Sequence, residues 1–154
     1  MVLPDGSLFG EGVKTRIKEE LLSKCNLHTI VRLPNGVFSP YTGIRTNLLF
    51  FEKGSPTKGI WYFEHPYPQG VKSYNKTYPI DIKEFDLEKA WWGNRKMTEH
   101  AWEVSLDEVR SRNYNLDIKN PHEVFEESLL SKDDLIEKLL ESQKKVAEIL
   151  QQLK

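Results

Sequence analysis

The sequence predicts an α/β fold in which one amphipathic helix covers a small open sheet. Apolar residues recur at helical spacing over residues 10–25, and three short apolar runs follow at 27–33, 47–52 and 60–63. A long loop and a tight turn rich in Gly and Pro separate these runs. The order helix, strand, loop, strand, turn, strand is typical of the last part of an open α/β sheet that ends in an antiparallel pair.

The first predicted helix spans residues 10–25. Val13, Ile17 and Leu21 recur every four residues, and we expect this stripe to face the sheet. Charged residues occupy the other side of the helix: Lys14, Arg16, Lys18, Glu19 and Glu20. Asn26 is a suitable stop at the carboxyl end.

The first predicted strand spans residues 27–33 and alternates strictly. One face carries Leu27, Thr29, Val31 and Leu33, and the other carries His28, Ile30 and Arg32. The run 47–52 is apolar on both faces, which indicates a central strand. A third strand at 60–63 follows a turn at 54–57. Residues 1–3 are too short to be predicted as a strand.

The loop between the first two predicted strands is the most informative feature of the chain. Gly36, Pro40 and Gly43 punctuate it, and Phe38 and Tyr41 are its candidates for exposed aromatic residues. Loops of this length between buried strands are usually functional or disordered. An aromatic ring held there on a rigid scaffold can stack on a flat ligand such as a nucleic-acid base.

Regular patterns weaken between residues 65 and 120, where prolines interrupt long elements. Trp91, Trp92 and Trp102 are predicted to form a satellite cluster that covers the sheet edge, and contact with a partner or DNA is the alternative. A short helix is predicted from Ser105, which caps it, to Arg112. The acidic residues of the 81–88 run are predicted to be solvated: Asp81, Glu84, Asp86 and Glu88.

A last helix is predicted to begin at Ser131. Apolar residues at alternating steps of three and four form its seam, with Gln143 as the polar exception: Ile136, Leu139, Val146, Leu150 and Leu153. Because an isolated helix of this size is marginal in water, we expect it to dock on another helix or subunit. Folding back onto its own domain is the alternative.

Composition places the chain among soluble proteins. Charged residues make up 29% and hydrophobic residues 38%. No apolar run reaches the roughly 18 residues of a membrane span, and no basic region precedes an apolar stretch at the N-terminus, so no membrane association is expected. The single cysteine fits a reducing cytoplasm. The four histidines do not cluster, and no metal site is expected.

Charge is distributed unevenly along the chain. Residues 1–60 carry eight Lys/Arg against five Asp/Glu, a balance of +3, whereas the whole chain is close to neutral. The basic part includes the long loop, which agrees with a surface that faces phosphate. An ordinary solvated surface has a similar composition.

The string LPNGVFSPYTGIRTNLLFFEKG, which begins at Leu33, resembles the late part of the catalytic domain of adenine-specific DNA methyltransferases. The resemblance is strongest to the modification subunit of type I restriction-modification systems. VLPDGSLFGEGVKTRIKEELLSKCNLHTIVRLP, near the N-terminus, and RNYNLDIKNPH, at 112–122, extend it. It implies the C-terminal portion of a Rossmann-like class I methyltransferase sheet, incomplete and ending in an antiparallel hairpin, plus a C-terminal amphipathic helix.

The resemblance also implies a division of the chain into three parts. Residues 1–64 correspond to the C-terminal part of the catalytic domain. Residues 65–122 correspond to an irregular, aromatic-rich extension. Residues 123–154 correspond to a helical segment that contacts other subunits, with its seam residues as the interface candidates.

Two motifs of the family are not found in this sequence. The family binds S-adenosylmethionine through a Gly-rich turn, and it carries out its chemistry with an Asn-Pro-Pro-Phe type tetrapeptide. The one Asn-Pro pair, Asn120-Pro121, is followed by His122 and does not match. We therefore expect no catalytic and no cofactor-binding residue in this chain, and no activity from the chain alone. The complete enzyme is expected to methylate adenine N6 in DNA.

The resemblance assigns residues to the target site. Phe38 matches the phenylalanine that stacks on the extruded target base, and the alternative is a ring that plugs the loop into the core. Tyr41, Thr42 and Arg45 are candidates for DNA contacts, whereas Arg45 could equally be solvated.

The implied partners are DNA, a specificity subunit, a second modification subunit, a restriction subunit and the missing N-terminal part of the methyltransferase, in the cytoplasm of a prokaryote. A second hypothesis is a non-catalytic protein-interaction or DNA-binding assembly module from a split or truncated gene.

Overall fold

A computed structural model describes residues 1–122, 136, 140 and 142–144. The chain divides into two compact units, Met1–Glu123 and Val124–Lys154. The first unit contains a five-strand sheet of order β1-β3-β2-β4-β5. The strands are β1 (Val2–Pro4), β2 (Cys25–Arg32), β3 (Thr46–Lys53), β4 (Gly59–Glu64) and β5 (Ala101–Ser105). The helices are η1 (Asp5–Ser7), α1 (Val13–Lys24), η2 (Ile82–Phe85), α2 (Asp86–Trp92) and α3 (Leu106–Ser111).

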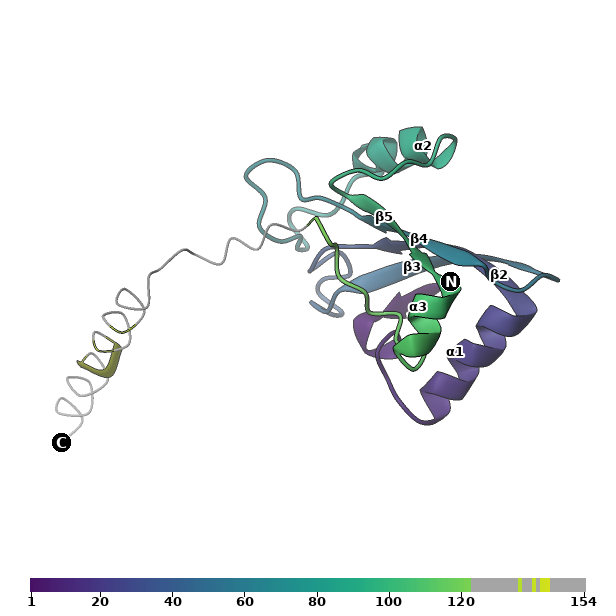
Figure 1. Cartoon of the computed structure of the whole chain (residues 1–154). Helices are drawn as coiled ribbons and strands as arrows, with labels where there is room; N and C mark the ends of the chain where they lie inside the picture. Colours follow the sequence, from purple (N-terminus) through teal and green to yellow (C-terminus); the bar gives the residue numbers. More distant parts are fainter. Residues whose placement is uncertain (123–135, 137–139, 141, 145–154) are drawn as a thin grey trace. The chain divides into compact units, whose positions relative to one another are not determined.

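The sheet is mixed. β3 lies between β1 and β2 and is antiparallel to both, so β1 and β2 run in the same direction and α1 connects them. β4 is parallel to β2 on its other side, and β5 is antiparallel to β4. Figure 1 shows α1 and α3 on one face of the sheet and α2 on the other. The strand that we expected to be absent at the N-terminus is present as β1, which is three residues long.

The predicted antiparallel hairpin of the strands at 47–52 and 60–63 is wrong: β3 and β4 do not pair, because β2 lies between them and their connection crosses the start of β2. Buried Thr57 fixes this crossing. Its hydroxyl donates to the Cys25 carbonyl at 2.8 Å and accepts from the Leu27 N–H at 2.8 Å. Its own N–H donates to the Leu22 carbonyl at 2.9 Å. These three long-range hydrogen bonds of Thr57 hold the connection across β2, and β4 follows on the far side of β2.

A bulge in β2 makes one part of the predicted alternation wrong. The register with β3 shifts between Leu27 and Thr29, so that one extra residue, His28, stands on β2. Leu27 therefore shares a buried cluster with Ile30, whereas Val31 and Leu33 belong to a cluster on the opposite face.

The buried face of α1 also differs from the predicted stripe. Val13 and Ile17 are 72% and 60% exposed, whereas Leu22 is buried and Lys18 is only 6% exposed. The Lys18 ammonium donates to the carbonyls of Leu8 and Gly10 at 2.7 and 3.0 Å. Burial, with repulsion from Lys14, lowers the pKa of Lys18. Its aliphatic stem can thus lie against the core because the ammonium satisfies backbone acceptors.

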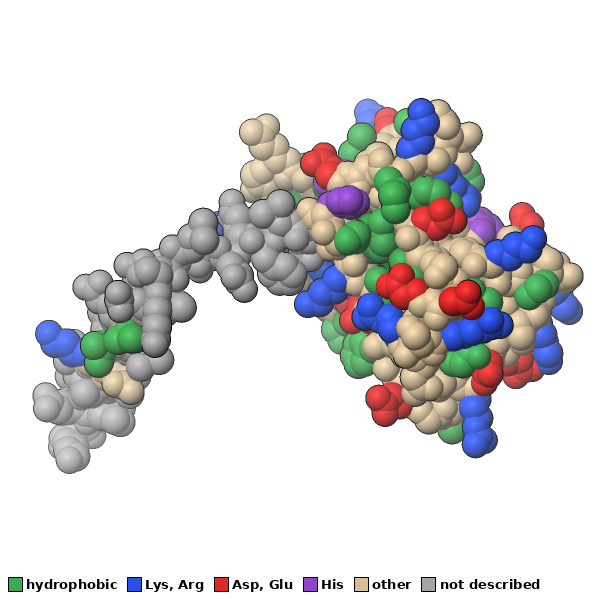
Figure 2. Space-filling view, in the orientation of Figure 1, with side chains coloured by type: hydrophobic (Ala, Val, Ile, Leu, Met, Phe, Trp, Pro, Cys, Tyr) green, Lys and Arg blue, Asp and Glu red, His purple; other side chains and the backbone are tan. Residues whose placement is uncertain are grey.

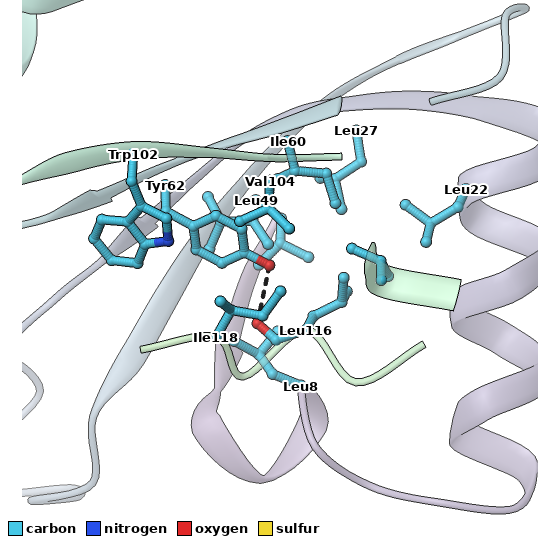
Figure 3. Packing of buried hydrophobic residues seen from close by; sticks show 12 residues of the cluster. Leu8, Leu22, Leu27, Leu49, Ile60, Tyr62, Trp102, Val104, Leu116 and Ile118 are labelled. Carbon is cyan, nitrogen blue, oxygen red and sulfur yellow. Dashed lines mark hydrogen bonds between the residues drawn. The ribbon is translucent and has the colours of Figure 1, made fainter. Parts of the chain in front are cut away.

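The main hydrophobic cluster lies under the face that α1 and α3 cover (Figure 3). Tyr62 of β4 and Trp102 of β5 stack there with ring centroids 5.3 Å apart. The Tyr62 hydroxyl donates to the Leu116 carbonyl at 3.1 Å, which ties the segment after α3 to the sheet. The prediction of a satellite cluster is therefore wrong for Trp102, which is a core residue.

The opposite face carries a second cluster, which contains Val31, Phe63 and Trp91. Trp92, also on α2, is 36% exposed, and the Arg95 guanidinium lies 4.8 Å from its ring centroid.

The predicted cap of the short helix α3 is confirmed, because the Ser105 hydroxyl accepts from the Glu108 N–H at 3.2 Å.

In the second unit, residues 136, 140 and 142–144 are helical. Of the predicted interface residues only Ile136 is described, and it is 49% exposed. Leu139, Val146, Leu150 and Leu153 lie outside the described residues. No helix in the described part of the chain has the length and apolar character that crossing a membrane requires.

Tyr62→Phe is predicted to destabilise the first unit by about 1–3 kcal/mol, because it leaves the buried Leu116 carbonyl without its donor. Urea denaturation of the two proteins measures this difference. Equal midpoints and slopes in the two curves would show that the bond does not hold the segment after α3.

His28 supplies a pH-dependent prediction. Burial, with repulsion from Arg95, lowers the pKa of His28 below its usual 6.5. The unfolded chain therefore binds this proton at a higher pH than the folded chain, so stability is lost as pH falls below about 6.5 through the folded pKa. Arg95→Ala is expected to raise the His28 pKa in an NMR titration, and a downward or absent shift would contradict the assignment.

Candidate nucleic-acid interface

The carboxyl ends of the three parallel strands β1, β2 and β4 lie at one edge of the sheet. In open α/β sheets this is the edge where ligands bind. The loop 33–45, hereafter the aromatic loop, leaves β2 at this edge. Phe38 is 40% exposed and Tyr41 is 93% exposed. The edge therefore presents two aromatic side chains to solvent.

Backbone hydrogen bonds give the aromatic loop its shape. The Ser39 N–H donates to the Gly36 carbonyl at 2.9 Å, and the N–H groups of Tyr41 and Thr42 donate to the Phe38 carbonyl at 3.0 and 3.1 Å. These bonds form consecutive turns that involve no side-chain atom of Phe38. The phenyl ring is therefore not one of the groups that hold the loop together by hydrogen bonding.

A second connection, residues 66–80 between β4 and η2, packs against the aromatic loop; we refer to it as the tyrosine segment. The Asn35 N–H donates to the Tyr67 hydroxyl at 2.9 Å, and the Tyr74 N–H donates to the Asn35 carbonyl at 3.4 Å. Gly36 adopts φ +82°, and a Cβ there would lie 2.1 Å from the Tyr74 carbonyl oxygen. Only glycine fits this contact without rearrangement.

Three tyrosines of this segment stack in a row. The ring centroids of Tyr67 and Tyr74 are 5.7 Å apart, and those of Tyr74 and Tyr78 are 6.3 Å apart. The middle ring is buried, and its hydroxyl donates to Glu84 Oε2 at 2.5 Å. Burial, together with this hydrogen bond, raises the pKa of Tyr74, so the hydroxyl remains a donor at neutral pH. The row is thereby fixed to η2.

Two of the predicted DNA contacts already have protein partners. Arg45 Nη1 lies 3.3 Å from Glu64 Oε1, at the end of β4. Thr42 Oγ1 accepts from the Ile44 N–H at 3.1 Å and stabilises the turn. In the described part of the chain the Tyr41 side chain has no polar partner. Arg45 has further N–H donors that could contact a phosphate while Nη1 stays on Glu64, and the Thr42 hydroxyl can still donate its hydrogen.

Arg32 joins the same edge to the segment after α3. Its guanidinium is buried, and it donates to the Ile118 carbonyl at 2.9 Å and to Asp117 Oδ1 at 2.6 Å. Asp5, at the end of β1, lies 3.8 Å away and also accepts from the Asn47 side chain at 2.6 Å. The sequence analysis missed this network, although an arginine that ends a run of apolar residues signals a buried ion pair.

A buried pair anchors α2 at the end of β4. His65 Nδ1 is hydrogen-bonded to Glu88 Oε1, and both side chains are almost fully buried. The prediction of a solvated 81–88 run is therefore wrong for Glu88. It is also wrong for Glu84, which binds Tyr74. No group of three or more His, Cys, Asp or Glu side chains in the described residues could hold a metal ion.

Gly36→Ala is predicted to destabilise the protein by more than about 2 kcal/mol, because alanine resists the positive φ and its Cβ meets the Tyr74 carbonyl. Gly43→Ala is the matched control, since no atom lies within 4 Å of a Cβ at that position. We expect the control to stay within about 1 kcal/mol of the parent in thermal or urea denaturation. Equal effects of the two substitutions would refute the close contact between the two loops.

Sequence comparison relates this chain to DNA methylases. The family model for N-6 DNA methylase matches residues 1–129. The EcoEI methylase subunit of a type I restriction enzyme from Escherichia coli is 53% identical over 161 residues, which cover 100% of this chain and 33% of that protein. The EcoKI methylase subunit from E. coli K12 is 51% identical over 123 residues, 71% of this chain and 23% of that protein.

Solved structures give the same relationship. The modification subunit of a putative type I restriction enzyme from Vibrio vulnificus YJ016 superimposes with a TM-score of 0.76 at 49% identity, over 80% of this chain and 27% of that one. A chain from a structure of type I restriction-modification complex assembly also gives 0.76, at 36% identity, over 99% of this chain and 34% of that one.

The resemblance to type I modification subunits predicted from the sequence is thus confirmed. The chain spans about a third of the length of the EcoEI relative. From the family match over most of its length, we conclude that this chain belongs to the N-6 DNA methylase family.

Proposed function

We propose that this chain forms the target-base side of a type I restriction-modification methyltransferase, which transfers a methyl group from S-adenosylmethionine to adenine N6 in DNA. The observation that carries the proposal is the exposed ring of Phe38 in a loop at the carboxyl-end edge of the sheet. Such enzymes must take the target base out of the duplex, because its reacting atom is otherwise out of reach.

Phe38 supplies one wall of the slot for the extruded adenine. Its exposure, 40%, supports this role over that of a core plug. The opposite wall and the acceptors for the adenine amino group belong to polypeptide outside this chain. Tyr41, Thr42 and Arg45 are the proposed contacts to the DNA backbone, because each has a donor that its contacts within the described residues leave available.

The donor-binding site also belongs to that other polypeptide. In the described residues, the glycines with positive φ are in separate connections: Gly12, Gly36, Gly54 and Gly70. They do not assemble the kind of Gly-rich turn that cradles a cofactor, so the residues present do not fit S-adenosylmethionine. The isolated chain is accordingly proposed to be inactive.

We assign the open side of β1 to the N-terminal part of the methyltransferase. In the described residues β1 is an edge strand that carries exposed Val2, and exposed Ile17 of α1 lines a groove together with Leu3 of β1. This groove of about 290 Å³ beside α1 is lined by apolar side chains that include Leu3, Ile17 and Leu21. About two-thirds of the EcoEI relative lies outside the part that this chain matches, and we assign the groove to that polypeptide. The five strands then form the C-terminal portion of an incomplete Rossmann-like class I sheet.

The other proposed partners rest on the similarity to type I modification subunits. We propose that residues 123–154 bind a specificity subunit through an amphipathic helix, with Ile136, Leu139, Val146, Leu150 and Leu153 at the interface. A second modification subunit and a restriction subunit complete the assembly in the bacterial cytoplasm.

A methylation assay with radiolabelled donor tests the proposal. We expect no incorporation into DNA by this chain alone, and incorporation when it is co-expressed with the rest of a type I methylase subunit. In that complex Phe38→Ala is expected to lower methylation about 5- to 100-fold, since one stacked base is worth about 1–3 kcal/mol. Phe38→Trp, which keeps a stacking face, should retain most activity.

Phe51→Ala is the matched control. Phe51 is also a partly exposed phenylalanine, but it lies at the end of β3, where β2 begins, away from the aromatic loop. Incorporation by the isolated chain, or equal activity of the Phe38→Ala and parent complexes, would contradict the assignment.

A further inference from the structure

The tyrosine segment, residues 66–80, has features that neither the core nor the proposed base slot explains. We propose that it is a second DNA-contact surface, in which Lys72 and Lys76 bind backbone phosphates and Tyr78 packs its ring against a base or sugar of the strand that carries the target. This inference rests on the proposed function, because it takes DNA to be the substrate.

The charge of the segment is of one sign. No acidic residue occurs between Glu64 and Asp81, whereas Lys72 and Lys76 both lie there. Both lysines are exposed, and neither makes an ion pair or hydrogen bond in the described part of the chain. Lys24 and Lys89 are paired with carboxylates of their own helices, whereas Lys53 and Lys58, among the described residues, also make no ion pair. Two unpaired ammonium groups on one connection are available to an external anion.

The acidic residues that flank the segment in the sequence already accept hydrogen bonds or ion pairs from other groups of the protein. Glu84 accepts from the Tyr74 hydroxyl and from the Asp81 N–H. Asp81 accepts from the Lys83 N–H and caps η2. Glu64 pairs with Arg45. None of them is bonded to Lys72 or Lys76, so both ammonium groups are available to bind an external anion.

Tyr78 is held in a fixed position with much of its surface open. The Asn75 side chain accepts from the N–H groups of Thr77 and Tyr78, both at 2.9 Å, and the Asn75 N–H donates to the Tyr78 carbonyl at 3.0 Å. Tyr78 is 50% exposed and is the last ring of the stack that begins at Tyr67. A ring preorganised in this way stacks on a further planar group with little loss of side-chain entropy.

The two loops form one continuous surface. Asn35 and Gly36 of the aromatic loop contact Tyr67 and Tyr74 of the tyrosine segment. Figure 1 shows the teal connection between β4 and α2 extending beyond this end of the sheet. Exposed rings beside unpaired cations are the combination by which proteins hold single nucleic-acid strands.

The surface over α1 and α3 is mixed in charge. In Figure 2, Lys and Arg side chains alternate there with Asp and Glu side chains, and no extended patch of one sign is visible. A DNA backbone therefore gains less from that face than from the edge that carries the aromatic loop and the tyrosine segment.

Fluorescence anisotropy of the full chain with a labelled single-stranded oligonucleotide, over a range of salt concentrations and without methyl donor, tests the proposal. Removing two phosphate contacts by K72A/K76A is expected to make the negative slope of log K against log salt shallower by about 1.4. The control K53A/K58A makes the same change in charge at the opposite end of the sheet, and we expect it to leave the slope unchanged.

The tyrosine is tested in the same assay. Tyr78→Ala is expected to weaken binding about 5- to 100-fold, and Tyr78→Phe, which keeps the ring, should bind like the parent. Absence of binding by the parent chain at low salt, or equal slopes for the two double variants, would overturn the proposal. Binding of polyglutamate as tight as that of DNA would overturn it as well.

These outcomes are separate from those of the methylation assay. If the complemented enzyme methylates DNA but K72A/K76A does not change the slope, the proposed function stands and the second surface does not. If K72A/K76A makes the salt dependence shallower as expected but co-expression with the rest of a methylase subunit gives no methylation, the chain binds DNA through the tyrosine segment without being part of such an enzyme.

Discussion

The buried guanidinium of Arg32 is the constraint on which the edge of the sheet depends. A charge removed from water at the last residue of β2 must be compensated, and losing one partner of a buried pair typically costs about 3–5 kcal/mol. Asp117 and the Ile118 carbonyl supply that compensation, and Asp5 lies nearby. The segment after α3 is therefore tied to the point where the aromatic loop begins, and β1, β2 and the 112–118 region share one anchor.

Local patterns in the sequence were sufficient to locate the elements but not to orient all of them. The strands at 27–33, 47–52 and 60–63 and the cap at Ser105 depend on nearest-neighbour chemistry, and the structure contains them. The buried face of α1 was mispredicted because the aliphatic stem of Lys18 lies at the core where an apolar residue was expected. A search for hydrophobic periodicity does not detect such a lysine. The bulge at His28 and the buried position of Trp102 result from pairing with β3 and β4, which are distant in the sequence.

The candidate site also combines features that local sequence predicts with features that it does not. Exposure of Phe38 and Tyr41 could be expected, because Gly and Pro placed both residues in a turn-rich loop outside the strands. The ion pair of Arg45 could not be expected, because Glu64 belongs to β4, whereas Thr42 bonds to Ile44 within the same turn. The tyrosine segment was not predicted as part of the site for a related reason. Its prolines indicated only irregular structure, and its hydrogen bonds to Asn35 join residues that are distant in the sequence.

The geometry separates two tasks that the proposed enzyme must perform. The apolar side chains around β1 lie along the side of the sheet and suit docking of further polypeptide, whereas Phe38, Tyr41 and Tyr78 lie on loops at the carboxyl-end edge. Gly36 holds those loops together through backbone contact with Tyr74, and neither residue lines the groove beside α1. In the proposed enzyme, docking of the N-terminal polypeptide and capture of the base therefore use different residues of this chain. A change in the loops can weaken the hold on DNA while the docking surface remains intact, and this independence follows from the sheet itself, whose rigid strands support both surfaces.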